Sequence, residues 1–335
     1  MLLRLLAAIT VLAAAAVVLV ASWPQLLGLH RELYVAQVVS LRGAVVVAAA
    51  VLLVLSLLLA TARRARRFAA SLAVLALVGG LLNLAVLAGR GAASAEFEAA
   101  GPDSITVLAW NTLGEAPGAE VLADLAAETG ADVVALPETT LGYAEEVAAL
   151  LTERGIAMRA LGASFDQVAK AHSTSLLIAE RLGDYRVDET VGSTSVLPSV
   201  VAVPVDGEGP AIGAVHPVAP VPAYMQHWRD DLAWVAGACT AEDTILAGDF
   251  NSTLDHWAGL GADGGDLGVC SDAAVAAGSG AVGTWPTDAP PLLGSAIDHV
   301  IAGPAWRVTG ARVVEGYDDA GSDHRPVVAQ LTPAR

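Results

Sequence analysis

The sequence predicts an α+β fold, a two-sheet β-sandwich flanked by helices in four α/β/β/α layers, preceded by three transmembrane helices. The first observation is charge: residues 1–100 carry 8 basic and 3 acidic side chains, whereas residues 101–335 carry 10 basic and 32 acidic ones, a net charge of −22. The second is that the long apolar runs all lie in the first part, while short strand-like segments dominate the second. The two parts therefore face different solvents, which excludes a single soluble globule.

Three uncharged apolar runs define the predicted membrane domain over residues 1–91. They cover residues 5–23, 43–62 and 68–89. A helix of about 20 residues crosses a hydrocarbon core of about 30 Å, so we expect each run to span a membrane. The first run has an alternative as a cleaved signal peptide, although it is longer than the apolar core of about 7–15 residues that such peptides carry.

Four arginines predict the orientation of these helices. Arg63, Arg64, Arg66 and Arg67 lie in the short loop between the second and third runs. Short loops rich in arginine stay in the cytoplasm, so the third helix leads outward. Residues 92–103 are predicted to form a linker, and residues 104–335 a catalytic domain outside the cytoplasm. The three runs hold no ionisable residue, which argues against a transporter.

The outer domain alternates short apolar segments with two amphipathic stretches. Residues 118–130 place Val121, Leu122 and Leu125 at helical spacing, and residues 224–239 do the same with Trp228 and Leu232. The strands are expected over residues 105–111, 132–136, 173–179, 200–205, 211–216, 244–247, 296–302 and 326–331. Strands dominate and helices are inserted between them, which favours two packed sheets flanked by helices.

Uncommon polar side chains follow or precede six of these strands. They are Asn111, Glu138, His216, Asp249 with Asn251, Asp298, and Asp323 with His324. One such residue would be ordinary turn chemistry, but six at strand ends indicate groups presented to a cleft. Oxygen ligands suit Mg²⁺ or Mn²⁺, and a metal with carboxylates and histidines supplies what phosphate-ester hydrolysis needs. Neither a GxxxxGK[ST] loop nor a GxSxG elbow is present.

These motifs, taken in order, resemble the endonuclease/exonuclease/phosphatase superfamily, which has the pancreatic-deoxyribonuclease-like fold. They are Trp110-Asn111, Leu136-Pro137-Glu138-Thr139, Gly248-Asp249-Phe250-Asn251, Ile297-Asp298-His299-Val300 and Ser322-Asp323-His324. The resemblance covers about residues 104–332. The three preceding apolar helices and Thr284-Trp285-Pro286 are similar to membrane-anchored bacterial members.

The resemblance implies a division of roles around a bound Mg²⁺ or Mn²⁺. Glu138 would be the principal metal ligand, with Asn111 beside it and Asp323 nearby. Asp249 would orient and deprotonate the attacking water. Family members often carry Gln before the metal-binding glutamate, where this chain has Pro137.

The resemblance also implies the groups that meet the phosphate. Asn251 would hold a phosphate oxygen, and His324 would bind the scissile phosphate. Asp298 would fix that imidazole or assist the leaving group, and His216 falls near the leaving oxygen.

Two further residues are predicted to bind substrate. Trp285 is expected to stack on it, with a packed cleft wall as the alternative. Arg325 is the only basic residue tied to a motif.

The charge pattern bears on the substrate. Proteins that bind nucleic acid normally present a basic face, and here ten basic residues are scattered over a domain of net charge −22. We therefore expect a membrane-anchored, metal-dependent phosphoesterase that acts on a small molecule or a lipid headgroup, with the bilayer as its partner and no obligate protein partner evident. The alternatives are an extracytoplasmic nuclease and a catalytically silent sensor or scaffold.

The two cysteines leave their state open. Cys239 and Cys270 lack CxxC spacing, which argues against a zinc ribbon. An oxidising compartment would permit a disulfide between them, whereas Cys239 on a buried helix could equally pack as a free thiol.

Overall fold

The computed structural model describes residues 1–93, 96–166 and 168–334. Two residues of the predicted linker, 94–95, and the last residue of the predicted catalytic domain, 335, lie outside the described part. The chain divides into two compact units, Met1–Arg90 and Gly91–Arg335. We call them unit 1 and unit 2 and describe each by itself.

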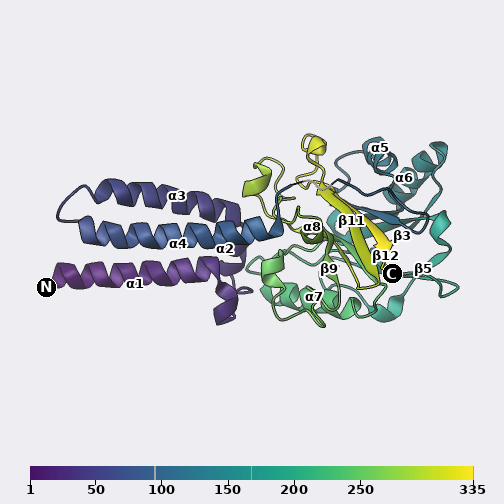
Figure 1. Cartoon of the computed structure of the whole chain (residues 1–335). Coiled ribbons are helices and arrows are strands. Elements are labelled where there is room, and N and C mark those ends of the chain that lie inside the picture. Colours follow the sequence, from purple (N-terminus) through teal and green to yellow (C-terminus); the bar gives the residue numbers. More distant parts are fainter. Residues whose placement is uncertain (94–95, 167, 335) are drawn as a thin grey trace. The chain divides into compact units, whose positions relative to one another are not determined.

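Unit 1 is a bundle of apolar helices. It contains α1 (Leu2–Ser22), α2 (Val35–Ser40), α3 (Arg42–Leu59) and α4 (Arg66–Arg90), and α1 and α3 both pack against α4 (Figure 1). The helices α1, α3 and α4 are long and apolar enough to cross a membrane. Buried polar groups join them: Arg42 Nη1 donates to Asn83 Oδ1 at 2.6 Å, and Asn83 Nδ2 donates to Ser22 Oγ at 3.0 Å. Unit 1 therefore supplies three candidate membrane spans.

Unit 2 consists of two six-stranded mixed sheets, as the sequence predicts. Sheet A has the order β11-β12-β1-β2-β4-β3 and sheet B the order β5-β6-β7-β8-β10-β9. The strands are β1 (Ile105–Ala109), β2 (Val133–Pro137), β3 (Met158–Ser164), β4 (Ser173–Ala179), β5 (Tyr185–Val187), β6 (Val200–Pro204), β7 (Ile212–Val215), β8 (Ile245–Asp249), β9 (Ser271–Asp272), β10 (Asp298–Ala302), β11 (Trp306–Val313) and β12 (Val327–Pro333). The helices are α5 (Ala119–Thr129), α6 (Leu141–Glu153), α7 (Met225–Ala238) and α8 (Ala273–Ala276).

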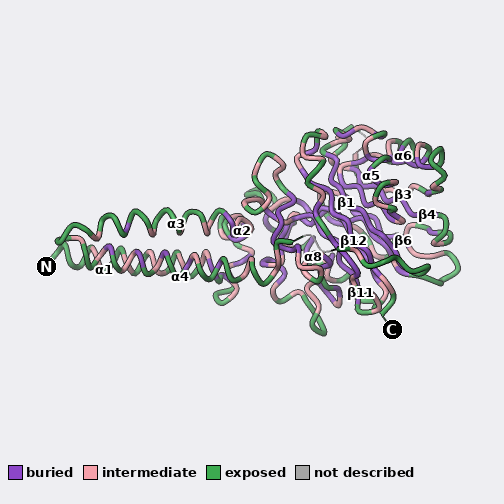
Figure 2. Tube along the Cα trace, turned by 45° about the horizontal axis from the view of Figure 1, so that its top comes forward, coloured by how far each residue is buried: buried purple, intermediate pink, exposed green. Residues whose placement is uncertain are grey.

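Side-chain alternation along the strands builds three apolar layers. In β1, Ile105 and Val107 point into the core between the sheets, while Leu108 packs under α5 and α6. On the other side, α7 covers the outer face of sheet B through Val235 and Leu246. Figure 1 shows α5 and α6 on one side of the sheets and α7 on the other, and Figure 2 shows buried chain concentrated in the strands. The predicted four-layer order is thus confirmed.

Several elements lie where no strand or helix was expected: β3, β5, β9, β11, α6 and α8. Helix α6 carries its own signals, because Thr140 Oγ1 accepts from the Tyr143 N–H as an N-cap and Val147 and Leu151 share its buried face. Strand β11 lies at the edge of sheet A and pairs with β12 alone, so its mixed sequence gives no alternation signal.

Strand direction brings the predicted polar groups to one end of the sandwich. β1 and β2 are parallel, as are β7 and β8. Asn111, just after β1, donates to Asp249 at the end of β8, so all four strands finish at the same end. β10 and β12 run antiparallel to them and begin there, with Asp298 opposite Asp249 and Ala109 opposite Val327. We call this the site end of unit 2.

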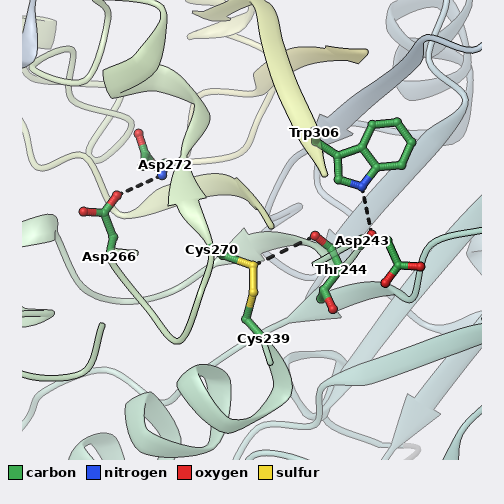
Figure 3. The surroundings of a disulfide bond; sticks show 7 residues. All are labelled: Cys239, Asp243, Thr244, Asp266, Cys270, Asp272 and Trp306. Atoms are coloured by element: carbon green, nitrogen blue, oxygen red, sulfur yellow. Dashed lines mark hydrogen bonds between the residues drawn. A yellow bond between two sulfur atoms is a disulfide. The ribbon is translucent and has the colours of Figure 1, made fainter. Parts of the chain in front are cut away.

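A disulfide joins Cys239 to Cys270, which resolves the alternative left open by the sequence. It ties the end of α7 to the segment before β9, with 6.0 Å between the two Cα atoms (Figure 3). Cys270 Sγ also faces the Thr244 carbonyl at 3.9 Å.

The first residues of unit 2 already pack against the rest of that unit. The Ala281 N–H donates to the Gly91 carbonyl at 2.8 Å, and the Glu98 N–H donates to the Thr309 carbonyl at 2.9 Å. An added Cβ at Gly91 would lie 2.0 Å from the Gly278 carbonyl oxygen, so this approach requires glycine.

Candidate active site

The backbone at the site end takes unusual conformations. Glu138 and Asn251 have φ angles of 58° and 46°, in the left-handed region that residues other than glycine seldom adopt. Such strain persists where surrounding structure over-determines it, and it gathers at functional sites. The residue before Asp249 is Gly248, at φ 138°, where a Cβ would lie 2.3 Å from the Val215 carbonyl oxygen. Local backbone geometry therefore aims these polar side chains.

Asn111 links two carboxylates. Its Nδ2 donates to Glu138 Oε1 at 3.2 Å and to Asp249 Oδ2 at 3.0 Å, while its Oδ1 accepts from the Leu113 N–H. Asn251 approaches Asp249 from the other side, with its N–H 2.8 Å from Oδ1 and its Nδ2 3.2 Å from Oδ2. Asp249 is thus fully buried and held by two amides.

His324 forms a charged pair with Asp298. Its Nδ1 lies 2.8 Å from Asp298 Oδ2, and its Nε2 faces Asp249 Oδ2 at 3.8 Å and Asp323 Oδ1 at 3.9 Å. Burial alone would lower the pKa of His324, but the charges of Asp298 and Asp249 outweigh it and raise the pKa to about 10. His324 is therefore a cation among three carboxylates.

His216 has the opposite state. Its Nε2 lies 3.8 Å from Asp249 Oδ2, and its buried Nδ1 has no hydrogen-bond partner among the described residues. Burial, together with the nearby charge of His324, lowers the pKa of His216 to about 3. The site therefore contains one charged and one neutral imidazole.

Burial raises the pKa of two carboxyl groups. The pKa of Asp249 rises to about 7 because the group is desolvated, although the charge of His324 opposes this. Burial also raises the pKa of Glu138, against the hydrogen bond from Asn111. A carboxyl with a pKa near neutrality can exchange protons with water at physiological pH.

Asp323 and Trp285 form the edge of the site. Trp285 Nε1 donates to Asp323 Oδ2 at 2.9 Å, while the indole ring stays partly exposed. The other carboxylate oxygen of Asp323 is buried and, in the described part of the chain, accepts no hydrogen bond, although His324 Nε2 lies 3.9 Å away. Trp285 is therefore placed where a bound substrate could reach it.

The structure does not bring Arg325 to the site, in contrast to the sequence expectation. Its guanidinium is buried and donates to the Asp318 carboxylate and to four backbone carbonyls, those of Gly283, Pro286, Thr287 and Ala289. Every N–H of the guanidinium has an acceptor, so none remains for a substrate. Arg325 instead holds together the loop that carries Trp285.

The sequence of this domain matches one protein family. The model of the Endonuclease/Exonuclease/phosphatase family matches residues 108–324, a span that contains the site from Asn111 to His324. The chain belongs to the endonuclease/exonuclease/phosphatase family. No curated protein matches the sequence.

Solved structures share this fold at low sequence identity. A humanized D. rerio TDP2 with 14 mutations has a TM-score of 0.52 and 19% identity, over 69% of this chain and 99% of that chain. D. rerio TDP2 complexed with single strand DNA product has a TM-score of 0.51 and 18% identity, over 68% of this chain and 99% of that chain. At such identity the likeness shows the fold alone.

Endonuclease/exonuclease/phosphatase enzymes are typically metal-dependent, and this donor set fits a cation. Asp249, Asp298 and His324 offer ligand atoms that lie within 4.8 Å of one another. Asp298 Oδ1 and Asp323 Oδ1 are buried and accept no hydrogen bond from the described residues. Buried carboxylates in this number call for positive charge. The chain is therefore a phosphoesterase of this family with a buried Asp/His cluster that could hold a metal.

Positioning residues of this family member escaped the sequence reasoning. Asp231 accepts the N–H groups of Ser195 and Val218 and so fixes the loop after His216. It lies on the apolar face of α7, and that helical spacing was the available signal. Ser322 Oγ donates to the Asn111 carbonyl at 2.6 Å and accepts from the His324 N–H at 3.0 Å.

Proposed function

We propose that the chain is a membrane-anchored phosphoesterase, dependent on Mg²⁺ or Mn²⁺, that hydrolyses a phosphodiester or phosphomonoester by attack of an activated water. The observation that carries this proposal is the pairing of Asp249 with His324. A carboxyl of pKa about 7 and an imidazole of pKa about 10 lie with Nε2 and Oδ2 3.8 Å apart. Base and cation are thus present together at physiological pH.

Asp249 is the proposed base. Asn111 and Asn251 donate to its two oxygens and hold the carboxylate in one orientation. The ionised form accepts a proton from water as that water attacks phosphorus. A divalent cation held by Glu138 and Asp323 would neutralise phosphate charge when bound. We do not assign it to the cluster of Asp249, Asp298 and His324, because the protonated His324 has no lone pair to offer a metal. We leave Asn111 out of that ligand set, because it turns its amide nitrogen to the carboxylates.

His324 is the proposed donor to the phosphate. Asp298 holds its Nδ1, which leaves the protonated Nε2 free to face the charge that develops on phosphate oxygens. Asn251 would add a hydrogen bond to the same group. The neutral His216 also lies 3.8 Å from Asp249 Oδ2, and we place the leaving oxygen beside it.

A nuclease remains the second candidate, since a structure of the same fold was solved with a single strand DNA product. The loops at the site end argue against it here. Their basic side chains, in the described residues, are Lys170, which pairs with Glu115, and the buried Arg325. Phosphate backbones need more positive charge than this. A silent sensor would not need the complete set of site residues.

Kinetics of two variants test the proposal. Full-length protein in detergent is assayed on a panel of phosphoesters with added divalent ions, and metal affinity is measured by isothermal titration. We expect Glu138→Ala to lose metal affinity and to recover partly at high Mg²⁺ or Mn²⁺. Asp249→Asn should keep metal binding and lose turnover by about 100-fold or more.

His324→Ala should lose about 3–4 kcal/mol of transition-state stabilisation without rescue by metal. Asp206→Asn, an exposed carboxylate at the opposite end of the sheets, is the matched control. Equal turnover in wild type and Asp249→Asn would overturn the mechanism.

A further inference from the structure

The exposed apolar side chains of unit 2 gather at one end. In its described residues, eight of the nine large apolar side chains that are exposed belong to loops or a helix start at the site end. The ninth, Val205, follows β6 at the opposite end. Single exposed apolar residues are ordinary, but clustering around a functional site is not.

Six of these side chains form what we call the apolar rim. They are Leu113, Phe165, Val221, Tyr224, Trp285 and Leu292.

The apolar rim is joined directly to the site. The Leu113 N–H donates to Asn111 Oδ1 at 3.0 Å, and Trp285 donates to Asp323. Phe165 follows β3, the edge strand of sheet A, whereas Leu292 precedes β10, next to the edge strand of sheet B. β3 packs near β6 and β10 near β12, so these two residues lie on opposite flanks of the site. The rim therefore lies around the site rather than along one groove.

The charge of unit 2 restricts which kinds of surface the apolar rim can bind. Residues 101–335 carry a net charge of −22, and the one exposed lysine of the site-end loops, Lys170, is paired with Glu115. Among the described residues, these loops therefore offer a nucleic acid no unpaired lysine or arginine, and an anionic membrane would be repelled. A neutral, zwitterionic lipid surface matches apolar side chains without requiring positive charge.

The chain also brings a bilayer within reach. Unit 2 begins at Gly91, the residue after the third candidate membrane span.

We propose that the apolar rim seats on a zwitterionic lipid surface and that the substrate is a phosphoester borne by a lipid in that surface. The lipid-substrate part rests on the proposed function, whereas the seating of the rim does not. Apolar side chains enter the acyl boundary, and the phosphate of the headgroup lies in the site that the rim surrounds.

Site-specific labelling tests the seating without any activity. Full-length Leu292→Cys and Val205→Cys proteins are labelled with an environment-sensitive fluorophore in phosphatidylcholine nanodiscs, with the native cysteines held in their disulfide. The two positions are matched in exposure, at 53% and 59%. We expect brominated lipid to quench the label at 292 at least threefold more than the label at 205. Equal quenching would overturn the seating.

A second copy of the chain is the competing occupant of the rim. It would shift the emission at 292 in a concentration-dependent way without quenching by brominated lipid, and that result would also overturn the proposal.

Turnover tests the substrate class. The Phe165→Ser/Leu292→Ser protein and the control Val205→Ser are assayed in nanodiscs on phosphatidylcholine and on the soluble diester bis(p-nitrophenyl) phosphate. We expect the ratio of lipid to soluble turnover to fall at least tenfold in the rim variant and to stay at the wild-type value in the control. Equal ratios, or wild-type turnover of the soluble diester alone, would overturn the lipid substrate. If wild type hydrolysed neither, the proposed function would fail while the labelling still decided the seating.

Discussion

Asp249 and His324 stabilise each other's charged form across 3.8 Å, and each is buried where water cannot do so. Two buried titratable groups with separated pKa values are a common arrangement for acid and base chemistry. The amides of Asn111 and Asn251 hold the carboxylate without adding charge. The pKa values of these two groups therefore predict how the rate of the reaction depends on pH.

We expect kcat/KM for a soluble diester to follow a bell-shaped pH profile. Activity should rise as pH passes upward through the pKa of Asp249, about 7, because the base must be ionised. A bound cation moves this limb to lower pH, since it favours the carboxylate. Activity should fall as pH approaches the pKa of His324, about 10, because the donor must keep its proton. A His324→Gln protein that retained the alkaline limb would contradict this assignment.

The sequence predicted the site residues from their positions at strand ends, and regular strand alternation explains how the structure turns them toward one another. Residues 245, 247 and 249 of β8 share the inner face, so Asp249 had to follow the core side chains into the space between the sheets. The same alternation turns His299 to the face opposite Asp298, where it packs against Phe250 and Trp257. Arg325 was predicted to bind substrate because it belongs to the motif of His324. Its guanidinium is instead surrounded by carbonyls of a loop whose path no local pattern encodes.

At the scale of elements, His299 ties β10 to β9 and to the loop after β8. Its Nδ1 lies 2.7 Å from Asp272 Oδ2 and its Nε2 2.9 Å from the Ser252 carbonyl oxygen. Both partners are acceptors, so both ring nitrogens carry protons. Burial alone would lower the pKa of His299, but the charge and hydrogen bond of Asp272 outweigh it and raise the pKa.

The stabilisation from His299 should therefore depend on pH. Its pKa is higher in the folded than in the unfolded chain, so the contribution is complete below about pH 6.5 and is lost as pH rises through the folded pKa. His299→Gln should lower the free energy of unfolding by about 3 kcal/mol near pH 6 and by less at alkaline pH. Urea unfolding of the wild-type and variant chains in detergent, at pH 6 and at pH 10, measures the difference in the free energy of unfolding at each pH. A difference between the proteins that stayed constant with pH would refute the charged state.

The disulfide secures a second pair of elements. Cys239 ends α7 and Cys270 precedes β9, with 31 positions between them (Figure 3). Closing a loop of that length stabilises a fold by about 4 kcal/mol. Cys239→Ser/Cys270→Ser should lose about this amount in urea unfolding, and wild type treated with reductant should match the variant. Two free thiols in non-reducing mass spectrometry of wild type would contradict the pairing.

The sequence predicted the buried strands more readily than the edge strands and one of the helices. A buried strand such as β4, residues 173–179, can be predicted because its sequence is a short, largely apolar run. Strands β11 and β5 lie at sheet edges with one partner strand each. Fewer of their side chains need to be buried, so their sequences show little apolar periodicity. Helix α6 carries a sequence signal for its start, because Thr140 is a favourable N-cap residue before Leu141.

At the scale of the whole molecule, the chain concentrates positive charge in one loop and negative charge in one unit. The segment between α3 and α4 carries Arg63 and Arg64, followed by Arg66 and Arg67 at the start of α4. Unit 2 holds 32 acidic side chains over residues 101–335 and a disulfide, which oxidising compartments preserve. The arginine-rich segment and the disulfide favour the same topology, with the segment in the cytoplasm and unit 2 outside.

Reporter fusions test this orientation directly. We expect alkaline phosphatase, which is active only outside the cytoplasm, to be active when fused after Arg335 and inactive when fused after Arg64, because arginine-rich loops resist translocation. Replacing the four arginines with serine should reduce activity of the first fusion severalfold, since the bias that orients α3 and α4 is then removed. A fluorescent reporter that folds only in the cytoplasm should give the reverse pattern. Its fluorescence after Arg335 would place unit 2 inside and, with it, the phosphoester supply in the cytoplasm.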